Sequence, residues 1–306
     1  QCRAGRPWRG RRVVRYNQGF VRGRRSPARP TDLAVQGNGV AIVGDKLRIG
    51  AVRYLNSKPL IECLPEMLPE AQITVDFPSR LADGLAGGRF DVALIPSIET
   101  LRLPGVRVVS NVCVSCDGPV RSVKMVGRVA PRKIATLALD EGSRTSAALA
   151  RILLKERFGI EPSLQPLGLG SLAENSPADA VVVIGDRAML PLGGPYEFVW
   201  DLGDEWRAWT GLPFVFAMWT AWPAAEIAGL GSPLGSARDR GLTRLGQIAR
   251  RSSAELGLAE AECLEYLRDA LVFHLGPRQR QGLERFADLA IGHGLAPEDS
   301  RLEFAD

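Results

Sequence analysis

The sequence contains few of the residues on which metal, nucleotide and nucleophilic sites usually depend. Only two of its 306 residues are histidine, His274 and His293, and both lie near the C-terminus, so a Ser-His-Asp arrangement is improbable. Cys113 and Cys116 have a CxxC spacing, but no second pair or nearby histidine completes a zinc site. No GxGxxG stands at a strand–helix junction and no P-loop is present. We therefore expect no metal and no nucleotide cofactor.

Long apolar runs are also missing. The longest runs are far shorter than the ~20 residues that a membrane-spanning helix needs, so the sequence predicts a soluble protein without a membrane partner. The five cysteines are irregularly spaced and no signal-peptide pattern is present, which indicates a reducing compartment and, by default, the cytoplasm. With 45% hydrophobic residues, the chain can bury a full core.

The net charge of +5 is unevenly distributed along the chain. Residues 1–46 hold ten arginines and one lysine against two aspartates, so this segment carries +9 and the remainder about −4. A basic body that binds nucleic acid is therefore not supported. The segment is rich in Gly and Pro and has no helix or strand periodicity, so we expect 1–46 to be a disordered, inert basic tail. A tail that binds nucleic acid or an acidic surface, or an Arg-rich transit peptide, is the alternative.

From Leu47 onward, strand and helix patterns alternate. The segments KLRIGAVRYL, ITVDFPS and DVALIPS are predicted strands with helices between them, an order that favours a mainly parallel sheet. A second series runs from the strand KIATLALD through a helix that ends at Gly159 to the strand DAVVVIGD. Two or three amphipathic helices are predicted from Ser236 onward, one of them with an apolar face of three residues (Leu242, Leu245, Ile248).

The stretch DGPVRSVKM, from Asp117 to Met125, separates the two series. Its Asp-Gly-Pro turn and the extended run after it could carry the chain from one lobe to another, with Ser122 in the cleft between them. The apolar segment PFVFAMW is predicted to be the return crossing. The sequence thus predicts an α/β, two-lobed periplasmic-binding-protein-like (type II) fold with two crossing strands and C-terminal helices. Lobe 1 would comprise 47–126 plus 214–306, and lobe 2 would comprise 127–213.

Such a fold binds its ligand in the cleft between the lobes, at the carboxyl ends of strands and the N-termini of helices. Helix N-termini present free N–H groups and partial positive charge, so they can hold a carboxylate or phosphate. Three strand–helix junctions would face the cleft: Asn56 with Ser57, then Ser97, then residues 143–146. For Asn56 and Ser97, the sequence alone favours ordinary helix capping.

The third junction is the richest in polar groups. It places three hydroxyls and a guanidinium within four residues (Ser143, Arg144, Thr145, Ser146), which favours an anion site. The alternative is that Ser143 is only an N-cap and Arg144 a solvated side chain. Asp186, at the end of the strand DAVVVIGD, could bind a hydroxyl or cap the next turn. From these patterns alone, a binding protein and a cofactor-free enzyme are equally compatible with the chain.

Several segments, in order, resemble one enzyme family: RIGAVRYLNSKPL, DVALIPSIE, VSCDGPVRSV, LALDEGSRTSAALARILL, VVVIGDRA and DLGDEWRAWTGLPFVFAMW. Over roughly Leu47 to Gly294, the chain is similar to the chorismate dehydratases of the futalosine route to menaquinone. The resemblance implies a cytoplasmic enzyme that removes water from chorismate, without a cofactor, to give 3-[(1-carboxyvinyl)oxy]benzoate. A solute-binding protein for a small carboxylate is the alternative, and the chain could be a monomer or a homodimer.

The resemblance also assigns residues. The Asn of the family's Y/F-L-N motif falls on Asn56 and the Ser of its GPV-x-S motif on Ser122, which implies that both are catalytic. We expect them to polarise the leaving hydroxyl and stabilise an enolate-like state, while the substrate's own enolpyruvyl carboxylate is a plausible base. Substrate binding is assigned to seven further residues: Ser57, Ser97, Ser143, Arg144, Thr145, Ser146 and Asp186. The related dihydroxynaphthoate synthases share the fold, but they have a different N-terminal signature and use a histidine that has no counterpart here.

Overall fold

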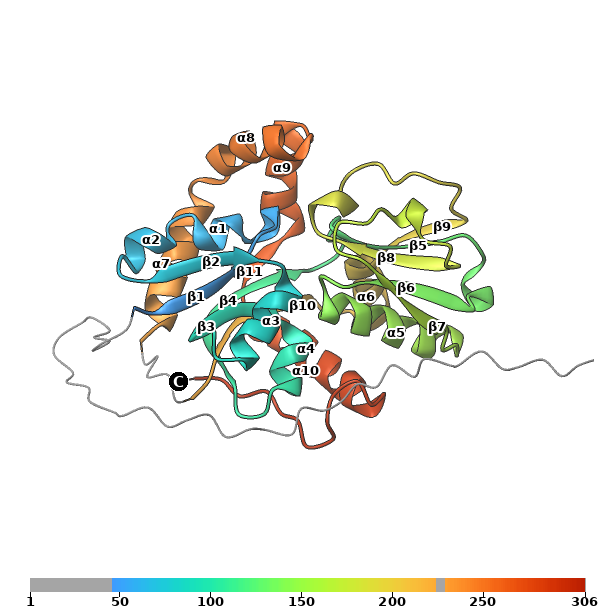
Figure 1. Ribbon diagram of the computed structural model, residues 1–306, viewed down its shortest axis with the longest axis horizontal. Coiled ribbons are helices and arrows are strands. Elements are labelled where there is room, and N and C mark those ends of the chain that lie inside the picture. The colour runs from blue at the N-terminus through green and yellow to red at the C-terminus, as the bar shows by residue number, and fades with distance from the viewer. Residues whose placement is uncertain (1–45, 224–228, 306) are drawn as a thin grey trace, which may run out of the picture.

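The computed structural model describes residues 46–223 and 229–305, which build two β-sheets flanked by helices (Figure 1). The predicted disordered tail lies outside the described residues, apart from Lys46. Within the described part of the chain, no helix combines the length and the apolar character that crossing a membrane requires.

The first sheet has six strands in the order β11-β4-β10-β3-β1-β2. Strand β1 is parallel to β2 and β3, whereas β10 is antiparallel to β3 and β4, and β11 is antiparallel to β4. Every residue of β3 is buried, as expected for a strand covered on both faces. The elements of this sheet up to the first crossing are β1 (Arg48–Val52), α1 (Lys58–Ile61), α2 (Leu64–Met67), β2 (Gln72–Asp76), α3 (Pro78–Ala86), β3 (Val92–Pro96), α4 (Ser97–Arg102) and β4 (Arg107–Cys116).

The second sheet has five strands in the order β7-β6-β8-β5-β9. Here β6 is parallel to β7 and β8, and β5 is antiparallel to β8 and β9. Both sheets are therefore mixed rather than mainly parallel, because β5 and β10, the strands that follow the two crossings, run antiparallel to both of their neighbours. The elements are β5 (Val123–Gly127), β6 (Thr136–Asp140), α5 (Arg144–Phe158), β7 (Ser163–Leu167), β8 (Ala180–Ile184), β9 (Phe198–Asp201) and α6 (Leu202–Thr210). As predicted, Gly159 ends α5, in a left-handed conformation.

The chain passes between the sheets twice. It leaves the first sheet after β4 and reaches the second through residues 117–122. It leaves the second sheet after β9 and returns to the first through α6. The segment predicted to be the return crossing forms β10 (Phe214–Ala221), which pairs with β3 and β4 inside the first sheet. The predicted boundary between residues 126 and 127 falls inside β5. We therefore propose that lobe 2 begins near residue 122 and ends, as expected from the sequence, at residue 213.

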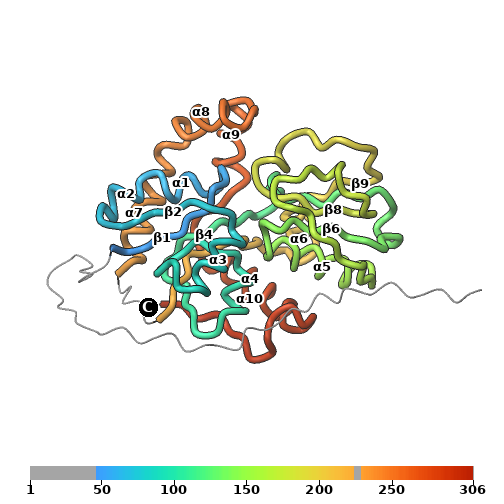
Figure 2. Tube along the Cα trace, in the orientation of Figure 1, coloured from blue at the N-terminus to red at the C-terminus, as the bar shows by residue number. Residues whose placement is uncertain are grey.

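The C-terminal part packs on the first sheet and contains more elements than the sequence predicted. They are α7 (Gly231–Leu242), α8 (Leu245–Leu256), α9 (Glu260–Glu265), a π-helical turn (Tyr266–Ala270), β11 (Val272–His274) and α10 (Pro277–Gly292). The expectation that Leu242, Leu245 and Ile248 share one helix face was wrong, because Leu242 ends α7 and Leu245 begins α8. Figure 2 shows α8 and α9 at one end of this part of the molecule and α10 at the other.

An aromatic cluster fixes the return of the chain into the first sheet. The Trp206 ring of α6 lies 5.2 Å from the Phe214 ring of β10, and Phe214 lies 5.0 Å from Phe286 of α10. All three side chains are fully buried, and Trp206 Nε1 donates to the Pro213 carbonyl at 3.0 Å. Such edge-to-face contacts hold α6, β10 and α10 in a single arrangement.

Candidate active site

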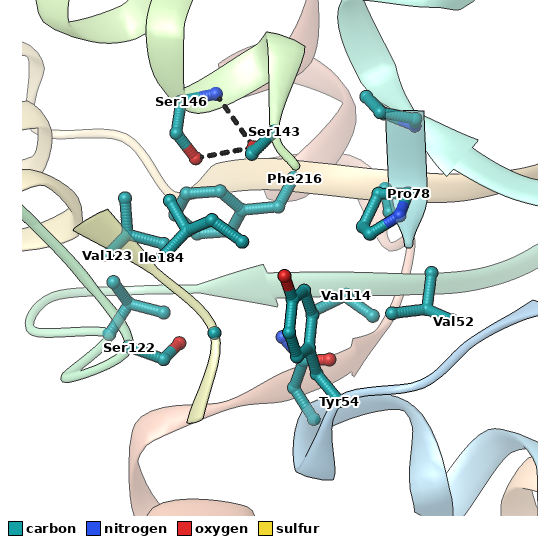
Figure 3. A pocket seen from close by; sticks show the side chains of 15 residues that line it. Val52, Tyr54, Pro78, Val114, Ser122, Val123, Ser143, Ser146, Ile184 and Phe216 are labelled. Carbon is teal, nitrogen blue, oxygen red and sulfur yellow. Dashed lines mark hydrogen bonds between the residues drawn. The ribbon is translucent and has the colours of Figure 1, made fainter. Parts of the chain in front are cut away.

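A cavity lies between the two sheets and contains about 480 Å³ of atom-free space, counting the part open to solvent (Figure 3). Its walls come from both lobes and are largely apolar, with Val52, Val114 and Phe216 on one side and Ile184 on the other. Its polar lining comprises Tyr54, Asn56, Ser122, Ser143 and Ser146. An apolar pocket with a few convergent polar groups is the usual form of a small-molecule site.

Ser122 occupies a tightly constrained loop. Its N–H donates to the Val120 carbonyl at 2.7 Å, which closes a three-residue turn centred on Arg121. Arg121 has φ of 62°, and it is the one non-glycine residue with positive φ among those the structure describes. A turn of this kind is strained and persists only where its surroundings hold it. Here the Asp201 carboxylate accepts the N–H groups of Val120 (2.9 Å) and Arg121 (2.5 Å).

The Ser122 side chain is 1% exposed and has a buried partner behind the cavity. Tyr266 Oη donates to Ser122 Oγ at 2.7 Å, although 144 residues separate the two in the chain. Burial raises the pKa of Tyr266 well above its usual range, so the phenol stays protonated. Sequence reasoning missed Tyr266, because no motif includes it and a contact over such a distance leaves no local signal.

Asn56 follows β1 in a short 3-10 turn (Leu55–Ser57) and lines the same cavity as Ser122. Its Oδ1 atom is buried and has no hydrogen-bond partner in the described part of the chain. A buried acceptor without a partner is unfavourable by roughly 1–3 kcal/mol. A bound molecule that presents a hydroxyl to Asn56 would satisfy it.

The N-terminus of α5 forms another wall of the cavity. Ser143 is its N-cap, accepting the Ser146 N–H at 3.2 Å and donating to Ser146 Oγ at 2.8 Å (Figure 3). Both serines line the cavity, and α5 is 15 residues long. Its positive end can therefore attract a negatively charged group. The third predicted junction does face the cleft, through these two residues.

The other two residues of that junction turn away from the cavity lining. Arg144 forms ion pairs with Asp83 at 2.7 Å and with the buried Glu99 at 3.1 Å. Thr145 Oγ1 accepts the Ile98 N–H at 3.2 Å and lies 3.3 Å from Ser97 Oγ. Arg144 and Thr145 of α5 and Ser97 of α4 therefore join the two lobes outside the cavity lining.

Ser57 and Asp186 also lie outside the cavity lining. The Ser57 hydroxyl is buried and donates to the backbone carbonyls of Val52 and Tyr54. Asp186, which follows β8, accepts the Leu55 N–H at 2.9 Å across the cleft. Burial raises the pKa of Asp186 to about 6. Asp186 thus holds the two lobes together at the edge of the site.

Tyr54 is a cavity residue that the sequence interpretation overlooked. Its ring packs so closely on Gly185 that a Cβ at position 185 would lie 2.4 Å from Tyr54 Cε1. Gly185 has φ of +74°, which also favours glycine. Burial, together with Asp140, raises the pKa of Tyr54, so this phenol stays neutral. Tyr54 belongs to the segment RIGAVRYLNSKPL, which resembles the enzyme family, so its place next to Asn56 could have indicated a role in the site.

At the cavity wall, positive partial charge comes from the N-terminus of α5 rather than from charged side chains. No charged side chain of the described residues lines the cavity. Nor do three His, Cys, Asp or Glu side chains gather as a potential metal site anywhere in 46–223 or 229–305. The arrangement suits a small, partly apolar anion, held at a helix N-terminus and contacted by neutral hydrogen-bonding groups.

Comparisons with known proteins identify relatives of this chain. A family model described as menaquinone biosynthesis matches residues 47–291. Chorismate dehydratase from Thermus thermophilus is 32% identical over 271 residues, which cover 81% of this chain and 96% of that protein. Chorismate dehydratase from Campylobacter jejuni is 25% identical over 255 residues, covering 81% and 99%.

Among solved structures, the periplasmic aliphatic sulphonate binding protein of Escherichia coli matches with a TM-score of 0.55 at 19% identity, covering 84% of this chain and 95% of that protein. This likeness concerns the fold alone, and it confirms the predicted periplasmic-binding-protein-like class. The family match over most of the chain and the Thermus relative together decide the assignment: the chain belongs to the menaquinone biosynthesis family.

Proposed function

We propose that this protein is a chorismate dehydratase, a hydro-lyase that converts chorismate into 3-[(1-carboxyvinyl)oxy]benzoate and water. Family membership supports the proposal, and so do curated relatives that carry this name. The observation that carries it is the meeting of Asn56 and Ser122 at one largely apolar cavity between the lobes. Both residues also occupy the positions that the family motifs imply for catalysis.

The reaction removes the ring proton at C3 and the hydroxyl at C4. The electron pair of the C3–H bond becomes the new ring double bond, the C4–O bond breaks, and the departing hydroxyl leaves with the proton as water. The product is aromatic, so aromatisation supplies much of the driving force. The protein has to hold a dicarboxylate in one pose and help the hydroxyl depart.

Ser122 and Asn56 have complementary roles in this scheme. The Ser122 hydroxyl donates a hydrogen bond to the leaving oxygen, and the unpartnered Asn56 Oδ1 is free to accept one from a substrate hydroxyl. Neither group is a good base near neutral pH. The base is therefore assigned to the substrate's own enolpyruvyl carboxylate, which would take the C3 proton and pass it to the leaving hydroxyl.

Substrate carboxylates would be held by backbone and hydroxyl donors. Ser143, Ser146 and the N-terminus of α5 are the donors at the cavity wall. We propose that Ser57, Ser97, Arg144, Thr145 and Asp186 support binding indirectly, by holding the lobes and the turn after β1 in place. The cysteines that the structure describes are all unpaired and buried, in keeping with the expected cytoplasmic location.

The test is to incubate the purified protein with chorismate, with and without a chelator, and to separate the products by chromatography. The proposal expects 3-[(1-carboxyvinyl)oxy]benzoate to form at the same rate in both samples. Tight binding of chorismate without product would favour a solute-binding protein. Neither binding nor product would reject chorismate as the substrate.

A further inference from the structure

Ser122 does not act alone, because its hydroxyl oxygen is already an acceptor. The Tyr266 phenol donates to Ser122 Oγ at 2.7 Å from behind the cavity wall, where both side chains are almost completely buried. A hydroxyl that accepts a hydrogen bond on its oxygen becomes a stronger donor through its own proton, because the bonds polarise one another. The cavity lies on the open side of Ser122, so its proton is available to a molecule bound there.

Tyr266 is well suited to a fixed, one-way hydrogen bond. Its ring is 0% exposed and belongs to the core cluster that joins the two lobes. It begins the π-helical turn Tyr266–Ala270 directly after α9, and π-helical turns inside helical segments are frequent at functional sites. The turn orients Tyr266 toward the crossing loop that contains Ser122.

The surroundings of Tyr266 keep its phenol protonated. Burial is the largest effect on the Tyr266 phenol and raises its pKa, whereas the Ser122 and Asn56 side chains lower that pKa by less. The phenol therefore stays protonated at neutral pH and can donate to Ser122 Oγ. A second contact holds the other side of the loop, since Asp201 accepts the N–H groups of Val120 and Arg121.

We propose that Tyr266 is a positioning residue for the dehydration: its hydroxyl donates to Ser122 Oγ and so directs the Ser122 proton toward the leaving oxygen of the substrate. Tyr266 does not line the cavity, so it acts through Ser122 rather than on the substrate. This inference rests on the function proposed above. It adds a third residue, from the C-terminal helical region, to a site that the sequence assigned to Asn56, in the turn after β1, and to Ser122, at the first crossing.

The test uses Tyr266→Phe, which removes one oxygen and keeps the ring that packs in the core. The matched control is Tyr196→Phe. The Tyr196 hydroxyl is also buried, but it has no partner in the described part of the chain and Tyr196 is not part of the cavity lining. Tyr266→Phe should lower kcat on the order of tenfold, as expected for the loss of one oriented hydrogen bond. Because Tyr266 does not touch the substrate, KM should stay within about twofold of wild type. Tyr196→Phe should leave both constants unchanged.

A double-mutant cycle separates positioning from packing. In the Ser122→Ala background, Tyr266→Phe should change the residual turnover by less than about twofold, because its partner is already gone. Product is collected over hours so that a low residual rate can be measured, and melting temperatures report folding. Wild-type turnover in folded Tyr266→Phe would overturn the inference, as would an equal loss with and without Ser122. Failure of the wild-type protein to form product would reject the proposed function instead.

Discussion

Replacing Asp186 by Asn should make the protein more stable at high pH but not at low pH. The Asp186 carboxyl accepts the Leu55 N–H across the cleft, and burial raises its pKa to about 6 from the usual 3.8. Below pH 3.8 both the folded and the unfolded chain are protonated, so the group has no effect on stability. Between 3.8 and about 6 the unfolded chain ionises while the folded one resists, so stability falls as pH rises.

The size of this effect follows from the two pKa values. At 1.36 kcal/mol per pH unit, the difference between 3.8 and about 6 corresponds to about 3 kcal/mol. This is an upper limit, because Asp186 keeps some contact with solvent, which screens its charge. Asn cannot ionise, yet its side-chain oxygen can still accept the Leu55 N–H. Asp186→Asn should therefore gain stability relative to wild type as pH rises from 4 to 8.

The assay is urea unfolding of both proteins at pH 4 and pH 8, followed by fluorescence. The quantity of interest is the difference in unfolding free energy between variant and wild type at each pH, because other titrating groups cancel in it. An increase toward the upper limit between the two pH values is expected. A difference that is the same at pH 4 and pH 8 would refute the claim that the interlobe contact buries this carboxyl.

Three further substitutions test how the cavity is held. Gly185→Ala places a Cβ 2.4 Å from Tyr54 Cε1 at a position with φ of +74°. This substitution should lower stability by roughly 1–3 kcal/mol, measured by thermal melting, and raise KM for chorismate, measured by steady-state kinetics. An unchanged KM would argue against the contact between Gly185 and Tyr54. Asp201→Asn loses the charged acceptor of four backbone N–H groups, those of Val120, Arg121, Gly203 and Asp204. The kcat of Asp201→Asn should fall more than that of Asp179→Asn, whose carboxylate also accepts backbone N–H groups in lobe 2 but is not part of the cavity lining. Equal losses would refute a specific role for the loop that contains Ser122. Arg144→Ala leaves the buried Glu99 with Arg102 as its remaining ion-pair partner. It should destabilise the protein by about 1–3 kcal/mol without abolishing turnover. Complete loss of activity in a well-folded variant would instead indicate that Arg144 contacts the substrate.

The sequence predicted what local patterns determine. The strand–helix alternation and the glycine at position 159 depend on periodicity and on capping preferences, and the structure contains both. Ser143 is the N-cap of α5, which the sequence offered as the alternative to an anion site. The motif that contains Asn56 and the one that contains Ser122 also lie at a common cavity. Each of these features is encoded within a few neighbouring residues.

Features that depend on tertiary packing were not predictable in the same way. Arg144 could have faced a ligand or a carboxylate, and only the approach of α3 and α4 directs it to Asp83 and Glu99. The strand β11 has three residues and takes its place from pairing with β4, so no periodicity marks it. Tyr266, which bonds Ser122, is the first residue of a π-helical turn after α9, an irregularity that no residue pattern indicated.

The central claim is that Ser122, at the crossing between the lobes, assists the loss of water from chorismate by donating a hydrogen bond to the leaving hydroxyl. The most direct test compares product formation by wild type, Ser122→Ala and Ser252→Ala. Ser252→Ala is the matched control, because the Ser252 hydroxyl is buried, lies outside the cavity lining and has no partner in the described part of the chain. Loss of a donor to the developing charge should lower kcat of Ser122→Ala by roughly 10²–10³-fold, with Ser252→Ala near wild type. Wild-type turnover by folded Ser122→Ala would contradict the account.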